Sequence, residues 1–374
     1  MDDRIERLQR RAAADPRVIG LAGGLPNEAQ FPRRALAGSF MRALSRAGAP
    51  ALQYGWAEGS ERLRSFVAAR LRARGAKVNA DHVIITSGAQ QAIAIALDLT
   101  CRPGDRVAVE SETYPAALEL MRARRLRPVD KLSGLASARA VYALPAVGNP
   151  RGLSMPAEAR RALLDSGLPI IEDDAYADLR FAGPAPAPLL ADAPGRVLHV
   201  GTLSKSLCPG LRIGWLVPPR NLRRQALELK QGEDLQSSSL GQAIAEDYLT
   251  GSGSATGIDF DQRLDKLRRF YAGRARRLAH SIRAHLPDWR FTPPQGGFAI
   301  FVEAPSRVDE VALLEAAVDS GVSFDVGSSF RASGAPDPLA LRLCFSLAAS
   351  DRFDEGARRI ALTWQRARRR RSRR

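Results

Sequence analysis

Residues 197–217 read VLHVGTLSKSLCPGLRIGWLV, two short apolar runs separated by a loop of hydroxyl and small residues. The runs, 197–200 and 213–217, have the length and bounding Gly and Pro residues of strands that are buried on both faces. The loop between them carries Lys205 and then Arg212, and a Pro-Gly pair keeps the loop from continuing as a helix. The stretch therefore predicts two strands joined by a polar loop at one end of a sheet.

Similar apolar runs precede this stretch, at 83–86, 107–110, 141–144 and 170–172. Helical patterns alternate with them, at 59–74 before the first run and at 89–100 after it. Short apolar strands that alternate with helices are typical of an α/β fold, in which helices cover both faces of a mostly parallel sheet.

The pattern changes after residue 254. We expect a long basic amphipathic helix at 259–286, a strand at 298–302, a helix near 307–320 and a strand at 341–345. This pattern predicts a smaller α+β domain. The expected parts of the chain are an N-terminal arm that joins the small domain (1–35), a large domain (36–256), the small domain (257–365) and a disordered Arg-rich tail (366–374).

The net charge of +16 comes mostly from arginine, because only five of the 56 basic residues are lysines. Seven arginines lie in the last nine residues. We interpret this run as a solvated tail and not as a nucleic-acid arm, because it has no aromatic side chain that could stack on bases. The sequence also has no helix-turn-helix or zinc-finger spacing, so nucleic acid is not an expected partner.

The cysteines and the distribution of apolar residues indicate in which cellular compartment the protein is expected. Three cysteines without a CxxC spacing fit a reduced, cytoplasmic compartment. No run approaches the roughly 18 apolar residues that a membrane-spanning helix requires, so no membrane association is expected. The four histidines show no ligand spacing, so no metal site is expected either.

Ligands of such sheets bind beyond the carboxyl ends of the strands, so the loops there carry the candidate site residues. Ser87, Gly88 and Ala89 open a helix, where free backbone N–H groups favour a phosphate, although small residues often only cap a helix. Lys205 is a rare lysine in an arginine-rich chain, and an amine can form a Schiff base whereas a guanidinium cannot. The alternative is that Lys205 is an incidental surface residue.

Three consecutive carboxylates, Glu172, Asp173 and Asp174, stand at the end of one predicted strand. Such a cluster is costly unless a positive group lies beside it. We interpret the cluster as a partner for a cationic ligand. Surface acids at the start of a helix are the alternative.

In their order along the chain, these motifs resemble the fold-type-I pyridoxal-phosphate (PLP) aminotransferases of class I/II, the group that includes 2-aminoadipate and kynurenine aminotransferases. The most specific motifs are Ser-Gly-Ala (87–89), Asn-Pro-Arg-Gly (149–152), Asp-x-Ala-Tyr (173–176) and Ser-Lys (204–205) followed by Arg212. Supporting motifs are Leu-Ala-Gly-Gly-Leu-Pro (21–26), Tyr-Gly-x-x-x-Gly (54–59), Thr-Tyr-Pro (113–115), Gln-Gly-Gly-Phe (295–298) and Leu-Arg-Leu-Cys-Phe-Ser (341–346). The resemblance covers about residues 19–365 and implies an aspartate-aminotransferase-like fold, with a mostly parallel seven-stranded sheet in a large PLP-binding domain and a smaller α+β domain.

The resemblance implies a role for each matching residue. Lys205 would bind PLP covalently and move the proton of the substrate α-carbon, Asp173 would pair with the pyridine nitrogen, and Tyr176 would hydrogen-bond the phenolic oxygen. These three are the expected catalytic residues. The residues expected to bind the cofactor are Ser87, Gly88, Ala89, Tyr114, Asn149, Asp173, Tyr176, Thr202, Ser204, Lys205, Arg212 and Tyr54.

The resemblance also implies how substrate and a second subunit are bound. Arg342 would hold the α-carboxylate of the substrate, assisted by Asn149 and Gly24, because a planar guanidinium suits a carboxylate better than an amine does. Tyr54 would reach the cofactor phosphate of a neighbouring subunit. A homodimer with shared active sites is therefore expected.

Four features depart from the family pattern. Arg151 replaces the usual threonine, Cys344 stands where many relatives have asparagine, and Asp325 lies in a turn where relatives usually have proline. The segment 127–141 is also shorter than in relatives. None of these features touches the inferred chemistry, but they leave the substrate open.

The expected reaction moves an amino group from an L-amino acid to a 2-oxo acid, with 2-oxoglutarate as the expected acceptor, in a ping-pong cycle. The alternative is another PLP-dependent reaction on an amino acid, catalysed by a lyase, cyclising synthase or oxidase, since the same motifs serve all of these. A third interpretation, a non-catalytic effector-binding domain of a transcription regulator, is less favoured because only 18 residues precede the resemblance.

Overall fold

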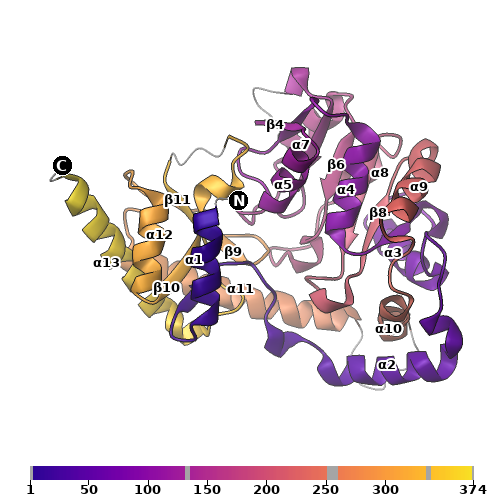
Figure 1. Cartoon of the computed structure of the whole chain (residues 1–374), viewed down its shortest axis with the longest axis horizontal. Helices are drawn as coiled ribbons and strands as arrows, with labels where there is room; N and C mark the ends of the chain where they lie inside the picture. Colours follow the sequence, from indigo (N-terminus) through magenta and orange to yellow (C-terminus); the bar gives the residue numbers. More distant parts are fainter. Residues whose placement is uncertain (1–2, 131–134, 251–259, 334–337, 373–374) are drawn as a thin grey trace.

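The computed structural model describes residues 3–130, 135–250, 260–333 and 338–372, and its elements are grouped around two sheets (Figure 1). The larger sheet has seven strands in the spatial order β2-β8-β7-β6-β5-β3-β4. In chain order they are β2 (Ile84–Thr86), β3 (Arg106–Val109), β4 (Arg127–Asp130), β5 (Ala140–Ala143), β6 (Ile170–Asp173), β7 (Val197–Thr202) and β8 (Gly214–Val217). Strands β3 to β7 are parallel to their neighbours among these five, whereas β8 runs antiparallel to β2 and β7.

Helices cover both faces of this sheet because its strands are apolar on both sides. Ile170 and Ile171, adjacent on β6, belong to two different hydrophobic clusters. One cluster contains residues of α4, α5 and α9, and the other contains residues of α3, α7 and α8. The helices of this part are α2 (Arg33–Ala47), α3 (Glu61–Ala73), α4 (Ala89–Thr100), α5 (Pro115–Ala123), α7 (Ala157–Asp165), α8 (Leu189–Asp192), α9 (Arg223–Asp234) and α10 (Ser239–Thr250). The predicted α/β fold with a mostly parallel seven-stranded sheet is confirmed.

The smaller sheet has four strands in the order β1-β10-β11-β9, and β1 pairs with β10 in parallel. The strands are β1 (Ile19–Leu21), β9 (Ala299–Glu303), β10 (Val322–Val326) and β11 (Ala340–Cys344). The accompanying helices are α1 (Asp3–Ala14), α11 (Phe260–His285), α12 (Glu310–Asp319) and α13 (Phe353–Ser372). Figure 1 shows α11 running from the larger sheet to the smaller one. The expected boundary at 256–257 lies outside the described residues, and the domain limits stay a prediction.

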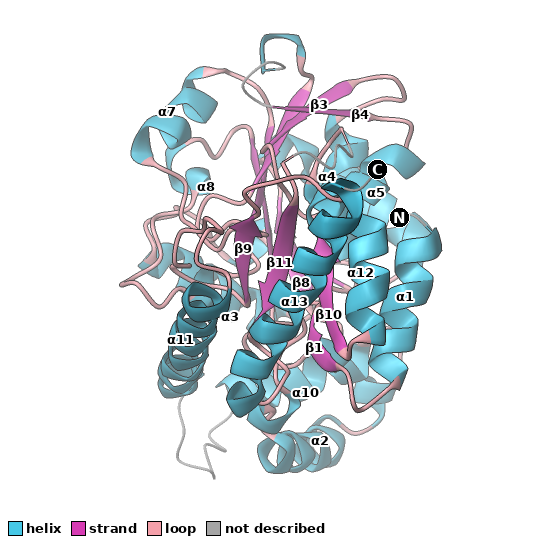
Figure 2. Ribbon diagram, turned by 90° about the vertical axis from the view of Figure 1, so that its left-hand side faces the viewer, coloured by secondary structure: helices cyan, strands magenta, loops and turns pink. Residues whose placement is uncertain are grey.

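The N-terminal helix α1 lies beside α12 (Figure 2). Ion pairs join Arg4 to Glu315 at 2.5 Å and Arg11 to Asp319. Gln9 also donates a side-chain hydrogen bond of 2.7 Å to the carbonyl oxygen of Phe324 on β10. The start of the chain is therefore attached to the smaller sheet.

The C-terminal tail differs from the sequence-based expectation. Helix α13 continues to Ser372, so the prediction of disorder is wrong for residues 366–372. Arginine is a good helix former, and cations near the last turn interact favourably with the helix dipole. Phe353, Ile360 and Trp364 bury the first part of the helix in the core.

None of the described helices combines the length and the apolar character needed to cross a bilayer.

Candidate active site

The predicted phosphate loop and the lysine loop meet because β8 lies between β2 and β7. Thr86 at the end of β2 pairs with Gly214 at the start of β8, and Gly214 pairs with Thr202 at the end of β7. The loops 87–89 and 203–212 therefore leave the sheet at the same corner. The next parallel strand, β6, ends beside them at Asp173.

Arg212 and Gly88 lie close together in this corner. The Arg212 guanidinium donates a hydrogen bond of 3.0 Å from Nη2 to the carbonyl oxygen of Ser87. Gly88 has φ +96°, and a Cβ added there would lie 2.5 Å from Nη2 of Arg212. Glycine is therefore required at position 88. A guanidinium beside the N-terminus of α4, which begins at Ala89, is a suitable cradle for a phosphate.

Hydroxyl groups complete the cradle, but one of them has another role than expected. Thr202 Oγ1 and Ser204 Oγ lie 2.9 Å apart, and the backbone N–H of Ser204 donates to Thr202 Oγ1 at 3.1 Å. The Ser87 hydroxyl instead donates to Asp234 at 2.7 Å, and Asp234 also accepts from the buried Lys230 at 2.7 Å. The backbone N–H of Ser87 also donates to Gln91 Oε1, at 2.8 Å, so both donors of Ser87 are bonded to side chains of the protein.

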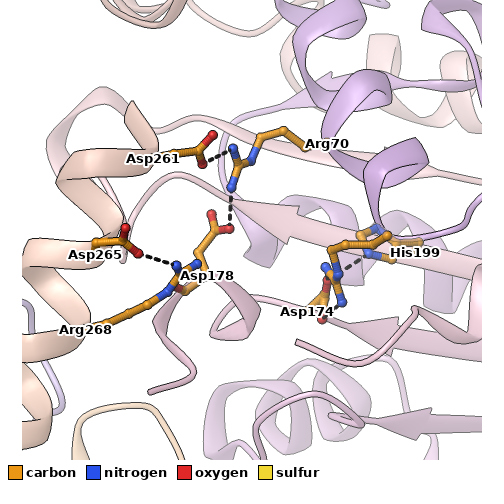
Figure 3. Close-up of polar contacts among 8 residues, drawn as sticks. Arg70, Asp174, Asp178, His199, Asp261, Asp265 and Arg268 are labelled. Atoms are coloured by element: carbon orange, nitrogen blue, oxygen red, sulfur yellow. Dashed lines mark hydrogen bonds and ion pairs between the residues drawn. The ribbon is translucent and has the colours of Figure 1, made fainter. Parts of the chain in front are cut away.

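The outer two of the three consecutive carboxylates have protein partners. Glu172 accepts backbone N–H groups of Leu189 at 2.7 Å and Leu190 at 3.1 Å, so it stabilises the start of α8. Asp174 lies beside His199, at 3.2 Å (Figure 3). It also forms an ion pair with Arg74. Burial opposes the charge of Asp174, but the Arg74 guanidinium and His199 lower its pKa to about 2.

Asp173 has only neutral hydrogen-bond donors among the described residues. The Tyr142 hydroxyl donates to its Oδ2 at 2.6 Å, and the backbone N–H of Ala175 donates to its Oδ1 at 3.1 Å. Burial raises the pKa of Asp173 above its usual value, although both hydrogen bonds favour the charged form. A buried carboxylate in this situation favours a cationic ligand group beside it.

Lys205 is not an incidental surface residue. Its Nζ lies 5.5 Å from the ring centre of Tyr176 and 5.7 Å from that of Phe298, and 3.5 Å from the carbonyl oxygen of Gly24. Burial and the nearby Arg342 lower the pKa of Lys205 to about 8. The amine is therefore neutral, and nucleophilic, at a much lower pH than an exposed lysine.

Arg342 lies on β11 with its guanidinium in the same site. Its Nη1 donates to Asn149 Oδ1 at 3.0 Å, and Nε and Nη2 donate to Asp325 Oδ2 at 2.9 and 2.8 Å. A Cβ added to Gly24 would lie 3.3 Å from Nη2. The three residues expected to bind substrate, Arg342, Asn149 and Gly24, are therefore neighbours.

These residues surround a cavity of about 790 Å3 that lies between the two sheets. Lys205, Tyr176, Asn149, Arg342, Gly24 and Tyr114 all line it. Tyr114 is partly buried, and burial raises its pKa to about 12. Helix α1 closes one side through Ile5, Glu6, Gln9 and Arg10. The cavity is large enough for an amino acid together with an aromatic cofactor.

Tyr54 does not line this cavity, and neither do Asp173 or the predicted phosphate residues around Gly88 and Arg212 in the described structure. The exposed fraction is 76% for Tyr54, 69% for its neighbour Leu52 and 81% for its neighbour Trp56. Within a single chain Tyr54 therefore has no contact with the cavity.

Two residues of the site were missed by sequence reasoning. The Tyr142 hydroxyl donates a hydrogen bond to Asp173. The one feature of the sequence that could have indicated this role is a hydroxyl side chain within an otherwise apolar predicted strand. Asp325 was noticed as a departure, but its position opposite Arg342 follows from the register of β10 and β11, which the sequence does not specify.

The comparison with known proteins agrees with this geometry. The model of the family aminotransferase class I and II matches residues 17–360. The chain belongs to this family. The aminotransferase is 32% identical to aromatic-amino-acid aminotransferase 1 of Thermococcus litoralis, over 92% of this chain and 88% of that protein. It is 31% identical to 2-aminoadipate transaminase of Thermus thermophilus, over 92% of this chain and 89% of that protein. Kynurenine aminotransferase of Pyrococcus horikoshii has a solved structure that matches with a TM-score of 0.88 and 30% identity, over 97% of this chain and 94% of that one.

The aminotransferase is a PLP-dependent transferase, and its site fits the cofactor. The corner at Gly88 and Arg212 has the positive charge and the free N–H groups that a phosphate requires. Asp173 is a buried carboxylate suited to a protonated ring nitrogen, and Lys205 is an amine of lowered pKa suited to an aldehyde. The three groups that the cofactor needs are therefore present.

Proposed function

We propose that this aminotransferase moves the amino group of an L-amino acid to 2-oxoglutarate, and that donor and acceptor bind the same site in turn, in a ping-pong cycle. The observation that carries the proposal is that Lys205 and Arg342 line one cavity, and that Lys205 lies close enough to both Arg342 and the buried Asp173 for their charges to act on its pKa. Of the two arginines that line the described cavity, Arg342 is the one whose charge acts on Lys205, so two substrates with α-carboxylates would use it in succession.

We assign the chemical steps to three side chains. Lys205 would hold the cofactor covalently and, once released, move the proton between the α-carbon and the cofactor, for which a pKa near neutrality is suitable. Asp173 would keep the ring nitrogen protonated, and the Tyr176 hydroxyl would donate to the phenolic oxygen. Bound PLP supplies the electron sink for the charge left on the α-carbon.

We assign the remaining residues to binding. Tyr114 would lie against the face of the cofactor ring, and Asn149 would bond both the ring oxygen and the substrate. Arg342 would bind the α-carboxylate, next to Gly24. The residues for the phosphate are Ser87, Gly88, Ala89, Thr202, Ser204 and Arg212.

We further infer a homodimer, because Leu52, Tyr54 and Trp56 are large apolar residues that are exposed within five positions of the chain, and a second copy would cover them. Tyr54 would then reach the phosphate in the partner. The three free cysteines support a reducing, cytoplasmic location.

The test of the reaction is a panel of amino donors with 2-oxoglutarate, scored for glutamate. The donors begin with 2-aminoadipate and aromatic amino acids, the substrates for which relatives are named. We expect the unaltered chain and a Lys266→Ala control, in which an exposed lysine of α11 is changed, to form glutamate, whereas Lys205→Ala should not. Consumption of a donor with release of ammonia or peroxide and no glutamate would contradict transamination and favour a lyase or an oxidase.

A further inference from the structure

Asp325 lies directly opposite Arg342, on the neighbouring antiparallel strand. One oxygen of its carboxylate, Oδ2, accepts hydrogen bonds from Nε at 2.9 Å and Nη2 at 2.8 Å. Nη1 donates to Asn149 at 3.0 Å. A guanidinium has five N–H groups, so three are committed to the protein and each terminal nitrogen keeps one further N–H for a ligand.

Both partners of this ion pair are held in place. The backbone N–H of Gly23 donates to the Asp325 carboxylate, at 3.1 Å to Oδ2 and 3.3 Å to Oδ1. The Phe330 ring centre lies 4.7 Å from the Arg342 guanidinium carbon, and Gly24 lies close to the same group. The arginine can therefore not swing away from Asp325 when a substrate arrives without disturbing these contacts.

The Asp325 carboxylate compensates the positive charge of Arg342, and the binding of a substrate carboxylate depends on that positive charge. Arg342 is 8% exposed, and although burial opposes its charge, Asp325 raises its pKa above the usual value. A substrate carboxylate on the two remaining N–H groups would lie beside the carboxylate of Asp325. Two negatively charged carboxylates that bind the same guanidinium repel each other strongly in a buried site. Arg10, another cation that lines the cavity, is paired with Glu6 at 2.6 Å.

We propose that Asp325 is a specificity-determining residue that orients Arg342 while weakening its hold on substrate carboxylates. The proposal rests on the proposed role of Arg342 as the carboxylate-binding residue. Its consequence for a ping-pong cycle is physical: the oxo acid formed in the first half-reaction must leave Arg342 before the acceptor can bind there. Interactions that bind ground and transition states equally do not raise the turnover rate, so a weaker hold speeds exchange without loss of catalysis.

The test is an equilibrium titration of the PLP-loaded enzyme with 3-phenylpropionate and with its neutral amide, 3-phenylpropionamide. Asp325→Asn and Asp325→Ser remove the negative charge, whereas Asp325→Glu keeps it. The control is Asp354→Asn, which changes an exposed carboxylate on α13. We expect at least one neutral variant to bind 3-phenylpropionate about threefold tighter or more. Affinity for the amide, and both affinities of the control, should stay as in the unaltered chain.

Unchanged or weaker binding of 3-phenylpropionate by both neutral variants would overturn the proposal, because Asp325 would then only support the arginine. Equal tightening in Asp325→Glu would overturn it too, since the charge is retained there. Arg342→Gln, titrated alongside, should lose affinity for the carboxylate and not for the amide. The proposed reaction is judged separately, by glutamate formation in the donor panel, so failure of one does not hide failure of the other.

Discussion

Glu172, Asp173 and Asp174 follow one another in the chain, yet each carboxylate meets a different environment. Glu172 is satisfied by backbone N–H groups of α8, and Asp174 by Arg74 and His199. Asp173, between them, is bonded by the uncharged Tyr142 hydroxyl and a backbone N–H. The charge of Asp174 is thus compensated within the protein, whereas burial raises the pKa of both Glu172 and Asp173. Asp173 ends β6 beside the lysine loop, where it is suited to a cationic ring.

Tyr142→Phe tests this account of Asp173. The hydrogen bond from Tyr142 favours the charged carboxylate, so its loss should raise the pKa of Asp173 further. A carboxylate that is harder to ionise pairs less well with the ring nitrogen. We expect turnover to fall about ten- to hundredfold, in line with the roughly 1.5–3 kcal/mol of a hydrogen bond to a charged group. The acid limb of the pH–rate profile should move to higher pH. Tyr248→Phe, on α10, is the control, and a Tyr142→Phe enzyme with an unchanged profile would contradict the role.

The lowered pKa of Lys205 predicts how apo-protein takes up PLP. Only the neutral amine attacks the aldehyde, and the amine is neutral above a pKa of about 8. The rate of covalent uptake should therefore rise with pH up to about 8 and level off above it, whereas an ordinary lysine would continue to gain up to about pH 10. Stopped-flow absorbance measures this rate, and a rise that continues past pH 10 would show that burial does not perturb the lysine.

Sequence reasoning identified the residues whose type is tied to the chemistry. Lys205, Asp173 and Arg342 stand in motifs that combine rare or costly residue types with strand ends, and the structure brings them to one site. Tyr142 and Asp325 were not assigned because their roles depend on which strand lies beside which, and in what register. Their partners are 31 and 17 residues away in the chain.

At the scale of elements, the sequence analysis did not predict β1, β4 and β10, which are short or mix apolar with polar residues. β4, Arg127–Asp130, contains a proline and two charged residues, and it lies at the edge of the sheet, where a proline is tolerated. The six strands of the larger sheet that were predicted have apolar runs buried on both faces, a far stronger signal. The basic tail was misread for a similar reason, because charge alone does not distinguish a solvated helix from an irregular segment.

Helix α13 provides a prediction about stability. Trp364 is buried and its ring centre lies 5.4 Å from that of Trp289, edge to face. Trp364→Ala should lower the free energy of unfolding by about 3–5 kcal/mol, as expected for a large buried aromatic side chain. Arg366→Ala, at an exposed side chain of the same helix, should cost under about 1 kcal/mol, because exposed charges contribute little. Urea denaturation measures both, and a larger loss from Arg366→Ala than from Trp364→Ala would contradict this account of the helix.

At the scale of the whole molecule, the cavity is lined by Asp325, Val326 and Arg342 of the smaller sheet and by residues that follow strands of the larger sheet, among them Lys205. Tyr54 does not line that cavity, and its neighbours Leu52 and Trp56 are exposed apolar residues as well. Exposed apolar side chains that gather in one patch are typical of interaction sites. The proposed homodimer would explain both why these side chains are exposed in a single chain and why a cofactor-type tyrosine stands among them.

We expect the double variant Leu52→Asp, Trp56→Asp to be monomeric, because two buried charges would have no partners in the interface. Its affinity for PLP should also fall, since Tyr54 would no longer reach a second subunit. Leu362→Asp, at another exposed apolar side chain on α13, is the control and should stay dimeric. Sedimentation velocity measures the state, and an unaltered chain that sediments as a monomer would rule out the shared site.

The central claim is that Lys205 carries the cofactor. Borohydride reduction of the yellow PLP-loaded protein fixes the cofactor to the amine that holds it, and peptide mass spectrometry then locates the modified lysine. The account predicts one modified residue, Lys205, and none in Lys205→Ala treated in the same way. Modification of Lys77, Lys131, Lys230 or Lys266 instead, or the same adduct in Lys205→Ala, would contradict it.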